Sequence, residues 1–568
     1  MRQISYLQGL FAALLLPATL SAQLAGGSWS VARQDLGSDA DGRAGEAVAL
    51  CGDVDGDGIG DLVVGMPFAS PNGLTWAGST LVRSGADGST IHRFDGSIVT
   101  GLAGVAVDAG GDVDGDGVGD ILVGSPFARI NGVANTGRVE VYSGATGALL
   151  STLDGLNPEG KWGISVAFLG DLNGDGRDEY GIGAFQATTS GIYQSGRAVV
   201  VDGASTSILY NLQGAVTHAQ LGFCVAAAGD VDQDGTPDFM VGAPTDNTPL
   251  HHAGKIFLHS GATGALIREL HGSWDSGHMG GRAANAGDVN GDGVPDQIGS
   301  AVAASMSGKT KAGAVRVWSG ADGALLFQYE GSHADQQLGE SLSAAGDLDQ
   351  DGFADFAVGG PRSNGPAGNL SGAVYLYSGR DGALIRRLDG AAGGDEFGSW
   401  LAFGDDLDGD GRGDLLVGVP GEDGASGDEG AVEIHAFDPF LRFGPQRLSA
   451  AAGGTIQWDI DFPSSEAGLK YLTMLSRSGT GPVGLGGLQF PLSPDSLFQS
   501  TSAGNYPNGF VTPTGFLDAN GDGTASFTAP PGFLVPRIGQ RFFTAVACYV
   551  PGQPGSLCSA PAMVEIVP

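Results

Sequence analysis

The chain of 568 residues has few basic residues: 27 lysines and arginines stand against 63 aspartates and glutamates, and the formal net charge is −36. A balance this acidic disfavours nucleic acid as a partner. Cysteine is also scarce, with four in the chain, and no segment after the N-terminus is apolar over the length that a bilayer requires. The nine histidines are dispersed, and no G-x-S-x-G, H-E-x-x-H or phosphate-binding loop occurs. The sequence therefore predicts neither a nucleic-acid-binding protein nor an enzyme of a class with these motifs.

The N-terminus has the pattern of a secretory signal peptide. Residues 1–22 contain Arg2, an apolar stretch near 10–20 and small residues at Ser21 and Ala22, and they are too few to span a membrane. We therefore expect a secreted, extracellular or cell-surface protein without a transmembrane segment. In that oxidising compartment Cys548 and Cys558 are expected to form a disulfide, whereas Cys51 and Cys224 are expected to be small buried apolar residues.

One acidic sequence motif contains most of the candidate functional residues; we call it the acidic phrase. Residues 52–67 read GDVDGDGIGDLVVGMP, with carboxylates at positions 1, 3, 5 and 9 of a D-x-D-x-D-G-x-x-D loop and a backbone carbonyl offered at position 7. Hard oxygen ligands at alternating positions around a glycine turn are typical of calcium loops. An EF-hand is excluded, because position 12 is Val64 within a β-branched run. The loop is therefore predicted to join two strands.

The phrase occurs seven times. Its first position moves along the chain in steps of 58 or 59 residues, through Asp53, Asp112, Asp171, Asp230, Asp288, Asp347 and Asp406. A fixed period of this size predicts a solenoid or a propeller. We expect up to seven Ca²⁺ ions and a fold that depends on them, since the metal-free carboxylates would repel one another. The predicted ligands, in order of loop positions 1, 3, 5, 7 and 9, are Asp53, Asp55, Asp57, Ile59 and Asp61; Asp112, Asp114, Asp116, Val118 and Asp120; Asp171, Asn173, Asp175, Arg177 and Glu179; Asp230, Asp232, Asp234, Thr236 and Asp238; Asp288, Asn290, Asp292, Val294 and Asp296; Asp347, Asp349, Asp351, Phe353 and Asp355; and Asp406, Asp408, Asp410, Arg412 and Asp414.

A second phrase follows each loop by about 30 residues, as in VEVYSGATGALLSTLDG (139–155). Two alternating runs around a glycine turn predict a hairpin, so each repeat holds four strands. Seven four-stranded units predict a seven-bladed β-propeller. The seventh repeat lacks its last strand, and we expect residues 28–37, SWSVARQDLG, to supply that strand and close the ring.

The acidic loop followed by G-x-P, with EFG (396–398) or QLG (220–222, 337–339) before the first strand, resembles the FG-GAP repeat. That repeat builds the N-terminal propeller of integrin α subunits and occurs in many bacterial secreted proteins. The resemblance covers roughly residues 28–439, although repeat 3 ends in GAF and repeat 5 in GSA. It implies the propeller fold and calcium sites, and it does not imply the partners of an integrin.

The regular period ends near residue 440. Runs such as TIQWDIDF (455–462) and FFTAVACYV (542–550) lie between Pro/Gly turns and predict strands. We therefore expect an all-β chain with a signal peptide (1–22), a propeller (23–439) and a small C-terminal domain that resembles a β-sandwich (440–568).

The loops on the face opposite the calcium loops vary in sequence, and binding sites favour such loops. We name this the variable face. Its candidate binding residues are Trp76, Trp162, Tyr193, His251, His252, Trp274, Lys309, Lys311 and Arg362. The favoured function is a monomeric, non-enzymatic binding or adhesion module for an extracellular protein or glycan. The alternatives are a lyase or hydrolase acting on extracellular polysaccharide, which a convergent cluster of histidines or carboxylates on the variable face would favour, and a purely structural envelope protein.

Overall fold

The structure, a computed structural model, consists of β-strands and one short 3₁₀ helix, η1 (Pro71–Gly73), within the residues that it describes. No helix of this described part is long and apolar enough to cross a membrane. The described residues are 27–37, 39, 41–348, 352–407, 413–423 and 428–439, and in the C-terminal part 441–443, 447–449, 454–461, 469–476, 482–485, 488–491, 510–511, 514–517, 522–529, 541–549, 555–558 and 562–567. The predicted signal peptide (1–22) and the predicted ligands Asp349, Asp351, Asp408, Asp410 and Arg412 lie outside them. The chain divides into two compact units, of which one consists of Val31–Gly346 and Ala354–Ala436 and the other contains Phe437–Pro568.

The first unit is built from seven four-stranded sheets, the blades of a propeller. In six of them the strands follow one another in the chain. Blade 1 contains β2 (Ala47–Gly52), β3 (Asp61–Met66), β4 (Ser79–Arg83) and β5 (Thr90–Asp95); blade 2 contains β6 (Ala106–Gly111), β7 (Asp120–Ser125), β8 (Arg138–Tyr142) and β9 (Leu149–Asp154); blade 3 contains β10 (Val166–Gly170), β11 (Glu179–Ala184), β12 (Arg197–Val201) and β13 (Ile208–Gln213). Blade 4 contains β14 (Cys224–Gly229), β15 (Asp238–Ala243), β16 (Lys255–His259) and β17 (Leu266–His271); blade 5 contains β18 (Met279–Gly287), β19 (Asp296–Ala301), β20 (Ala314–Trp318) and β21 (Leu325–Glu330); blade 6 contains β22 (Ser341–Ala344), β23 (Phe356–Gly360), β24 (Ala373–Tyr377) and β25 (Leu384–Asp389). The prediction of a seven-bladed, all-β fold is confirmed.

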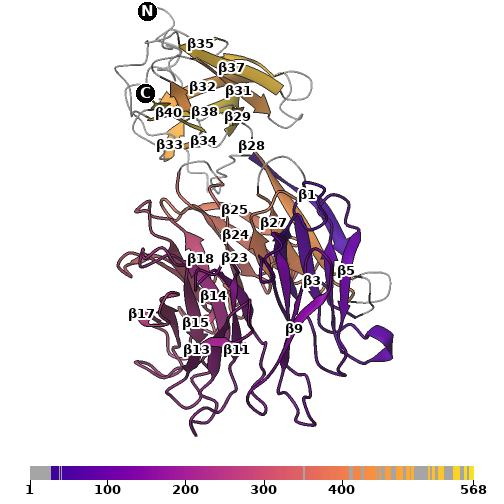
Figure 1. The fold of residues 1–568 in the computed structure, drawn as a ribbon. Coiled ribbons are helices and arrows are strands. Elements are labelled where there is room, and N and C mark those ends of the chain that lie inside the picture. Colours follow the sequence, from indigo (N-terminus) through magenta and orange to yellow (C-terminus); the bar gives the residue numbers. More distant parts are fainter. Residues whose placement is uncertain are drawn as a thin grey trace, which may run out of the picture. The chain divides into compact units, whose positions relative to one another are not determined.

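Blade 7 closes the ring with a strand from the other end of the propeller sequence. It contains β26 (Leu401–Phe403), β27 (Leu415–Val419), β28 (Ala431–Pro439) and, outside β28, β1 (Gly27–Leu36). In Figure 1 the indigo strand β1 lies beside the orange strands of this blade. The amide of Gly37 donates a hydrogen bond to the carbonyl oxygen of Gly430 at 2.8 Å. The expectation that residues near 28–37 supply the missing strand is confirmed.

The core lies between neighbouring blades. The second strand of each blade, such as β3 or β7, is buried along its whole length. Such a strand is covered on both faces, which explains why LVVG-like apolar runs follow every acidic loop. Val63 and Val82 of blade 1, for example, pack in one cluster with Val107 and Ile121 of blade 2. Cys51 joins the same cluster and is free, as is the buried Cys224, so the expectation for both thiols is confirmed.

The loops of the variable face are joined across the blades by a repeated backbone pattern. The loop between the second and third strands of one blade offers a carbonyl oxygen, and the loop before the first strand of the next blade donates an amide to it. Lys161 N donates to Asn135 O at 2.9 Å, and His278 N donates to His252 O at 3.1 Å. The side chains of this face therefore differ from blade to blade, while the backbone beneath them is held in the same way.

The regular secondary structure described in the second unit consists of strands. One sheet is formed by β29 (Leu441–Phe443), β31 (Gly454–Asp461), β37 (Asp522–Ala529) and β35 (Phe510–Val511); a second is formed by β30 (Arg447–Ser449), β40 (Ala562–Val567), β38 (Arg541–Tyr549), β32 (Lys470–Ser476), β36 (Thr514–Phe516) and β39 (Gly555–Cys558); and β33 (Pro482–Leu485) pairs with β34 (Leu488–Pro491). Cys548 and Cys558 lie on the paired strands β38 and β39. Their side chains are outside the described part of the chain, so the disulfide stays a prediction.

Candidate metal loops and the variable face

Each acidic loop is shaped by hydrogen bonds from its own backbone to its carboxylates. In loop 1, Asp53 Oδ1 accepts from Asp57 N at 3.0 Å, and Asp53 Oδ2 accepts from Gly58 N at 2.8 Å. Asp55 Oδ1 accepts from Asp57 N at 3.1 Å, and Asp57 Oδ1 accepts from Ile59 N at 2.8 Å. Asp55 and Asp57 each use one oxygen in these bonds. Their second oxygens could therefore serve a cation without any change in the fold of the loop.

The described residues contain four groups of three carboxylates whose oxygens lie within 4.8 Å of one another. They are Asp53, Asp55 and Asp57; Asp112, Asp114 and Asp120; Asp175, Glu179 and Asp202; and Asp230, Asp232 and Asp234. In the last group Asp230 Oδ1 is buried without a hydrogen-bond partner. A buried carboxylate oxygen without a partner is costly, and a bound cation would satisfy it. An all-oxygen donor set of this kind fits a hard divalent cation.

The other three loops follow the same design as far as the structure describes them. In loop 5, Asp288 Oδ2 accepts from Gly293 N at 2.9 Å, and Asn290 stands at position 3. In loop 6, Asp347 Oδ2 accepts from Gly352 N at 2.9 Å. Loop 7 is described at position 1, Asp406, and at position 9, Asp414. The middle residues of loops 6 and 7 lie outside the described part of the chain, and the metal ligands of all seven loops stay predictions.

The position-9 carboxylates have a structural role that the sequence analysis missed. Asp61 is fully buried; its Oδ2 accepts from Val54 N at 2.8 Å, and its Oδ1 accepts from Gly85 N at 3.0 Å. Gly85 belongs to the turn between the third and fourth strands, so the carboxylate ties that turn to the acidic loop. The same position is at most 1% exposed in all seven loops, at Asp61, Asp120, Glu179, Asp238, Asp296, Asp355 and Asp414. The sequence feature that could have indicated this role is the constant length of the S-G-x-x-G-A-L turns, to which these carboxylates bind.

The burial of Asp414 bears on whether residues 412–414 could be recognised by a receptor. Residues 412–414 spell Arg-Gly-Asp, a motif that integrins recognise, but Asp414 Oδ2 accepts from Leu407 N at 2.9 Å inside the propeller. A carboxylate held there does not reach an external receptor. The tripeptide is part of loop 7 and not an adhesive signal.

Loop 3 includes a carboxylate that the sequence analysis did not predict. Asp202 lies in the turn after β12 and joins Asp175 and Glu179 in one of the four acidic groups. Asn173 Nδ2 donates to Glu179 Oε1 at 2.8 Å and to Asp202 Oδ2 at 3.3 Å. The sequence signal is a single letter: the turn begins with Asp-Gly in repeat 3 and with Ser-Gly in repeats 1, 2, 4, 5 and 6.

Neighbouring loops are also joined through their backbones. Asp178 N, at position 8 of loop 3, donates to Asp112 O of loop 2 at 2.9 Å. Gly60 N of loop 1 donates in the same way to Asp406 O of loop 7 at 3.1 Å. These two bonds join each loop to the loop of a neighbouring blade.

The metal-free propeller is expected to lose stability as the pH rises from about 4 to about 7. The pKa of Asp120 and Asp296 is raised to about 6 and that of Glu179 to about 7, chiefly by burial and in smaller part by neighbouring loop carboxylates, against the lowering effect of hydrogen bonds from backbone amides. In this range the folded protein holds protons that the unfolded chain has already released, so raising the pH favours unfolding. Urea unfolding in chelator at pH 5, 6, 7 and 8 measures this dependence. A stability that rises with pH in chelator would contradict it.

Most predicted residues of the variable face lie on that face, but two do not serve as free binding groups. Trp76 and Tyr193 are 50% and 56% exposed. Trp162, in contrast, is 2% exposed and packs in the core between blades, so its prediction as a binding residue is wrong. It occupies the apolar position before the first strand, which Ala44 fills in repeat 1. Trp274 is partly buried, and the guanidinium of Arg316 lies over its ring at 4.5 Å.

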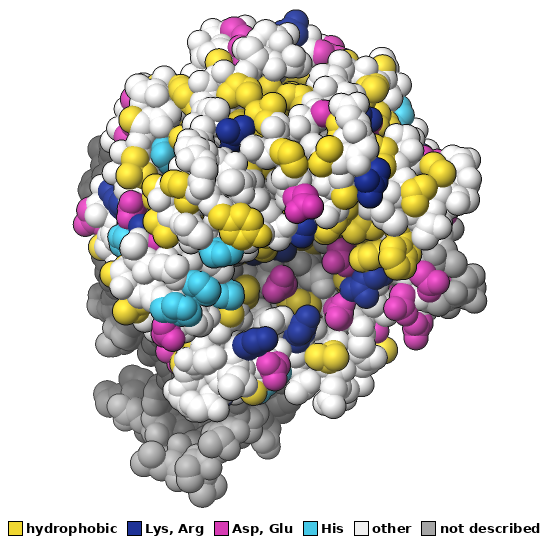
Figure 2. All heavy atoms as spheres, turned by 90° about the horizontal axis from the view of Figure 1, so that it is seen from below, with side chains coloured by type: hydrophobic (Ala, Val, Ile, Leu, Met, Phe, Trp, Pro, Cys, Tyr) yellow, Lys and Arg dark blue, Asp and Glu magenta, His cyan; other side chains and the backbone are white. Residues whose placement is uncertain are grey.

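Four of the dispersed histidines meet on this face, which the sequence did not predict. The rings of His251 and His252 stack with centroids 4.1 Å apart, and the ring of His278 lies 6.2 Å from that of His252. His218 packs edge-on against Tyr193 at 5.1 Å. In Figure 2 histidines gather beside basic and hydrophobic side chains. All four come from loops on this face in blades 3 to 5.

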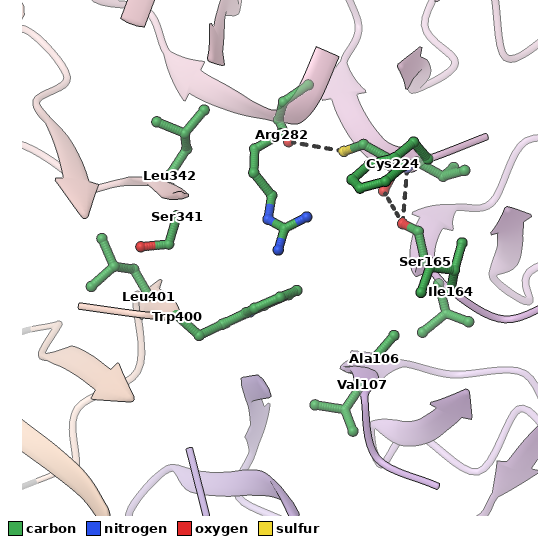
Figure 3. A pocket seen from close by; sticks show the side chains of 14 residues that line it. Ala106, Val107, Ile164, Ser165, Cys224, Arg282, Ser341, Leu342, Trp400 and Leu401 are labelled. Carbon is green, nitrogen blue, oxygen red and sulfur yellow. Dashed lines mark hydrogen bonds between the residues drawn. The ribbon is translucent and has the colours of Figure 1, made fainter. Parts of the chain in front are cut away.

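The axis of the propeller holds a cavity of about 110 Å³. It is lined by residues at or near the start of successive first strands, among them Ala106, Ser165, Cys224, Arg282, Ser341 and Trp400 (Figure 3). The Arg282 guanidinium lies over the Trp400 ring at 5.0 Å, and its Nε donates to Glu340 O at 2.9 Å.

The polar groups of this cavity are engaged with the backbone. Ser341 Oγ donates to Gly398 O at 2.6 Å, and Val225 N donates to Ser165 Oγ at 2.9 Å. A nucleophilic site needs a base within hydrogen-bond reach of its hydroxyl. Neither serine has such a base among its described partners.

Comparisons with known proteins agree with this architecture. Five segments match the FG-GAP repeat model: residues 44–82, 103–142, 225–259, 338–377 and 397–434. They are repeats 1, 2, 4, 6 and 7, and the two without a match are those that lack G-x-P. Both still form complete blades, 3 and 5.

Integrin α subunits are among the relatives. The chain is 31% identical over 218 residues to integrin alpha-8 of Mus musculus, which is 36% of this chain and 20% of that protein. It is 29% identical over 228 residues to integrin alpha-V of Gallus gallus, covering 38% and 22%, and 33% identical over 188 residues to integrin alpha-PS5 of Drosophila melanogaster, covering 30% and 18%. The matched region spans about a fifth of the length of these relatives. None of them is named as an enzyme, in agreement with the prediction that this chain is not one. Five of the seven blades match the FG-GAP repeat model, so the chain contains FG-GAP repeats within a seven-bladed propeller and is similar to integrin α subunits over about a third of its length.

Proposed function

We propose that this protein is a secreted or cell-surface, calcium-binding propeller that acts as a binding or adhesion module for an extracellular protein or glycan. In this proposal residues 23–439 form the propeller, residues 440–568 a separate domain, and the chain acts as a monomer. Up to seven Ca²⁺ ions occupy the acidic loops, held by the side chains of positions 1, 3, 5 and 9, of which position 9 is buried, and by the carbonyl of position 7. The ions neutralise the loops and fix the scaffold, and the variable face supplies the contacts.

The proposal rests mainly on one repeated observation. Each blade has a hydrogen-bonded acidic loop on one face of the propeller and loops of variable sequence on the opposite face. The orphaned oxygen of Asp230 supports the cation, and the integrin relatives support an adhesive role on the cell surface. The histidine group offers a reason to consider catalysis, but its rings face one another and Tyr193. Among the described residues the carboxylate paired with them is that of Asp275, 3.8 Å from His251. Cleavage of a glycan by two carboxylates would need a second one, and none is paired with these histidines within the described part of the chain.

Binding is expected to need both calcium and a folded propeller. We expect the purified protein to co-sediment saturably with cell-surface material from its own source in calcium, and to be released by chelator. The measurement is the bound fraction against protein concentration, with circular dichroism in each buffer to follow folding. Absence of retention in calcium, with the protein folded, would contradict the adhesion role and favour a structural one.

A further inference from the structure

The variable face presents two left-handed residues at each of six blade junctions. One lies in the loop between the second and third strands and accepts a hydrogen bond at its carbonyl oxygen in the pattern described above; the other donates its amide from the loop before the next blade. All have φ between 44° and 63°. The six pairs are Trp76 and Leu102; Asn135 and Lys161; Gln194 and Gln220; His252 and His278; Lys311 and Gln337; and Leu370 and Glu396.

None of these twelve positions is occupied by glycine. A left-handed conformation costs an L-residue about 1–2 kcal/mol, whereas glycine adopts it freely. Other positive-φ positions in the same loops do carry glycine, such as Gly78, Gly137 and Gly163. The chain therefore keeps a side chain at each of the twelve positions against a backbone cost. Strain retained in this way is typical of functional surfaces.

The lysines of the propeller are concentrated on this face. Of its four lysines, Lys255 pairs with Glu269 at 3.1 Å, but no ion pair among the described residues involves Lys161, Lys309 or Lys311. Lys161 lies between two rings, with its Nζ 4.8 Å from the centre of Phe127 and 5.2 Å from that of Phe185. Its pKa is lowered by burial alone. In a chain of net charge −36, ammonium groups without carboxylate partners are available to an external anion.

The groups between these lysines favour hydroxyls over further charge. Burial and then the neighbouring His251 lower the pKa of His252, and burial and then His252 lower that of His278. At neutral pH both imidazoles are therefore uncharged, and each can donate and accept a hydrogen bond. The carboxamide of Gln220 has the same double capacity, the oxygen of the Gln194 carboxamide is already hydrogen-bonded to His218 Nδ1 at 2.9 Å, and Tyr193 offers an exposed ring.

We propose that an arc of the variable face, formed by Lys161, Tyr193, His218, His252, His278 and Lys311, binds a carboxylate-bearing polysaccharide. The inference rests on the proposed binding function and names its ligand. The lysines pair with the uronate carboxylates, the imidazoles and amides bind sugar hydroxyls, and the tyrosine ring packs against a sugar face. An acidic peptide fits less well, because it offers carboxylates without a matching density of hydroxyls.

The test is calorimetric titration of the full-length, calcium-loaded protein with a galacturonate hexamer and a hyaluronan hexamer, both too short to gel with calcium. We expect saturable binding to at least one of them. Lys161→Gln and Lys311→Gln are each expected to weaken it about tenfold, and the double variant about a hundredfold, because each removes a charge-assisted hydrogen bond. Both substitutions install a residue that other blades carry at the same left-handed positions, Gln220 and Gln194, so the variants should fold. Arg386→Gln, a charge removal on the outermost strand β25, is the matched control and should change the affinity less than about twofold.

Three results would overturn the inference: no binding of either uronate, equal affinity of the double variant and the wild type, or equal binding of a glutamate hexamer. The sedimentation assay tests the proposed function separately: the function fails if the folded wild-type protein is not retained in calcium. If the double variant is still retained by cell-surface material in calcium, the binding function stands and the arc is not its site.

Discussion

Removing calcium is expected to lower the melting temperature of the full-length protein by roughly 10 °C. Extracellular calcium modules have dissociation constants of about 10⁻⁴–10⁻³ M, and at ten to a hundred times that concentration each site adds about 1.4–2.7 kcal/mol. The four carboxylate groups of the structure would together contribute about 6–11 kcal/mol. That sum is comparable to the whole stability of an ordinary domain, about 5–15 kcal/mol. The position-9 carboxylates, which link the loops to the blade turns, transmit the loss of metal to the sheets.

Scanning calorimetry in calcium, in chelator and in chelator with excess calcium restored measures this effect. The third sample should regain the melting temperature of the first. Magnesium in place of calcium serves as a further control, and it should stabilise less, because it demands a near-octahedral shell and gives up its water reluctantly. Equal melting temperatures in calcium and in chelator would contradict a calcium-dependent fold.

Gly137→Ala is expected to destabilise the calcium-loaded propeller by about 3 kcal/mol or more. Gly137 has φ +87°, and a Cβ built there would lie 2.1 Å from the carbonyl oxygen of Trp162 and 2.6 Å from its amide nitrogen. Both atoms belong to the backbone of the next blade, which a single side chain cannot displace cheaply. The substitution would therefore force two blades apart in addition to the cost of the left-handed conformation.

The matched control for this variant lies in the same loop. Gly132 has φ +84°, but no atom lies within 4 Å of a Cβ placed there. Gly132→Ala should therefore cost only the conformational part, about 1 kcal/mol. Urea unfolding of both variants in calcium gives the comparison. Similar losses for the two would mean that the close approach of the blades is not what the glycine serves.

The blade architecture of the propeller could be predicted from its repeats. The spacing of the acidic phrase gave the number of blades, the alternating runs gave four strands in each, and the count of strands in repeat 7 identified β1 as the closing strand. These features could be predicted because the same local patterns recur in every repeat. The pattern persists even in blades 3 and 5, where G-x-P is lost.

The tertiary structure decided which side chains meet. Trp162 and Trp76 both lie in loops of the variable face in sequence terms, yet one is buried between blades and the other exposed. Asp202 enters loop 3 from a different turn, and His218, His252 and His278 come together from loops of separate blades. The sequence could not supply these relations, because each depends on how a loop of one repeat packs against the next. The repeat spacing and the alternation of polar and apolar residues specify the blades. The positions of functional side chains relative to one another depend on contacts between blades.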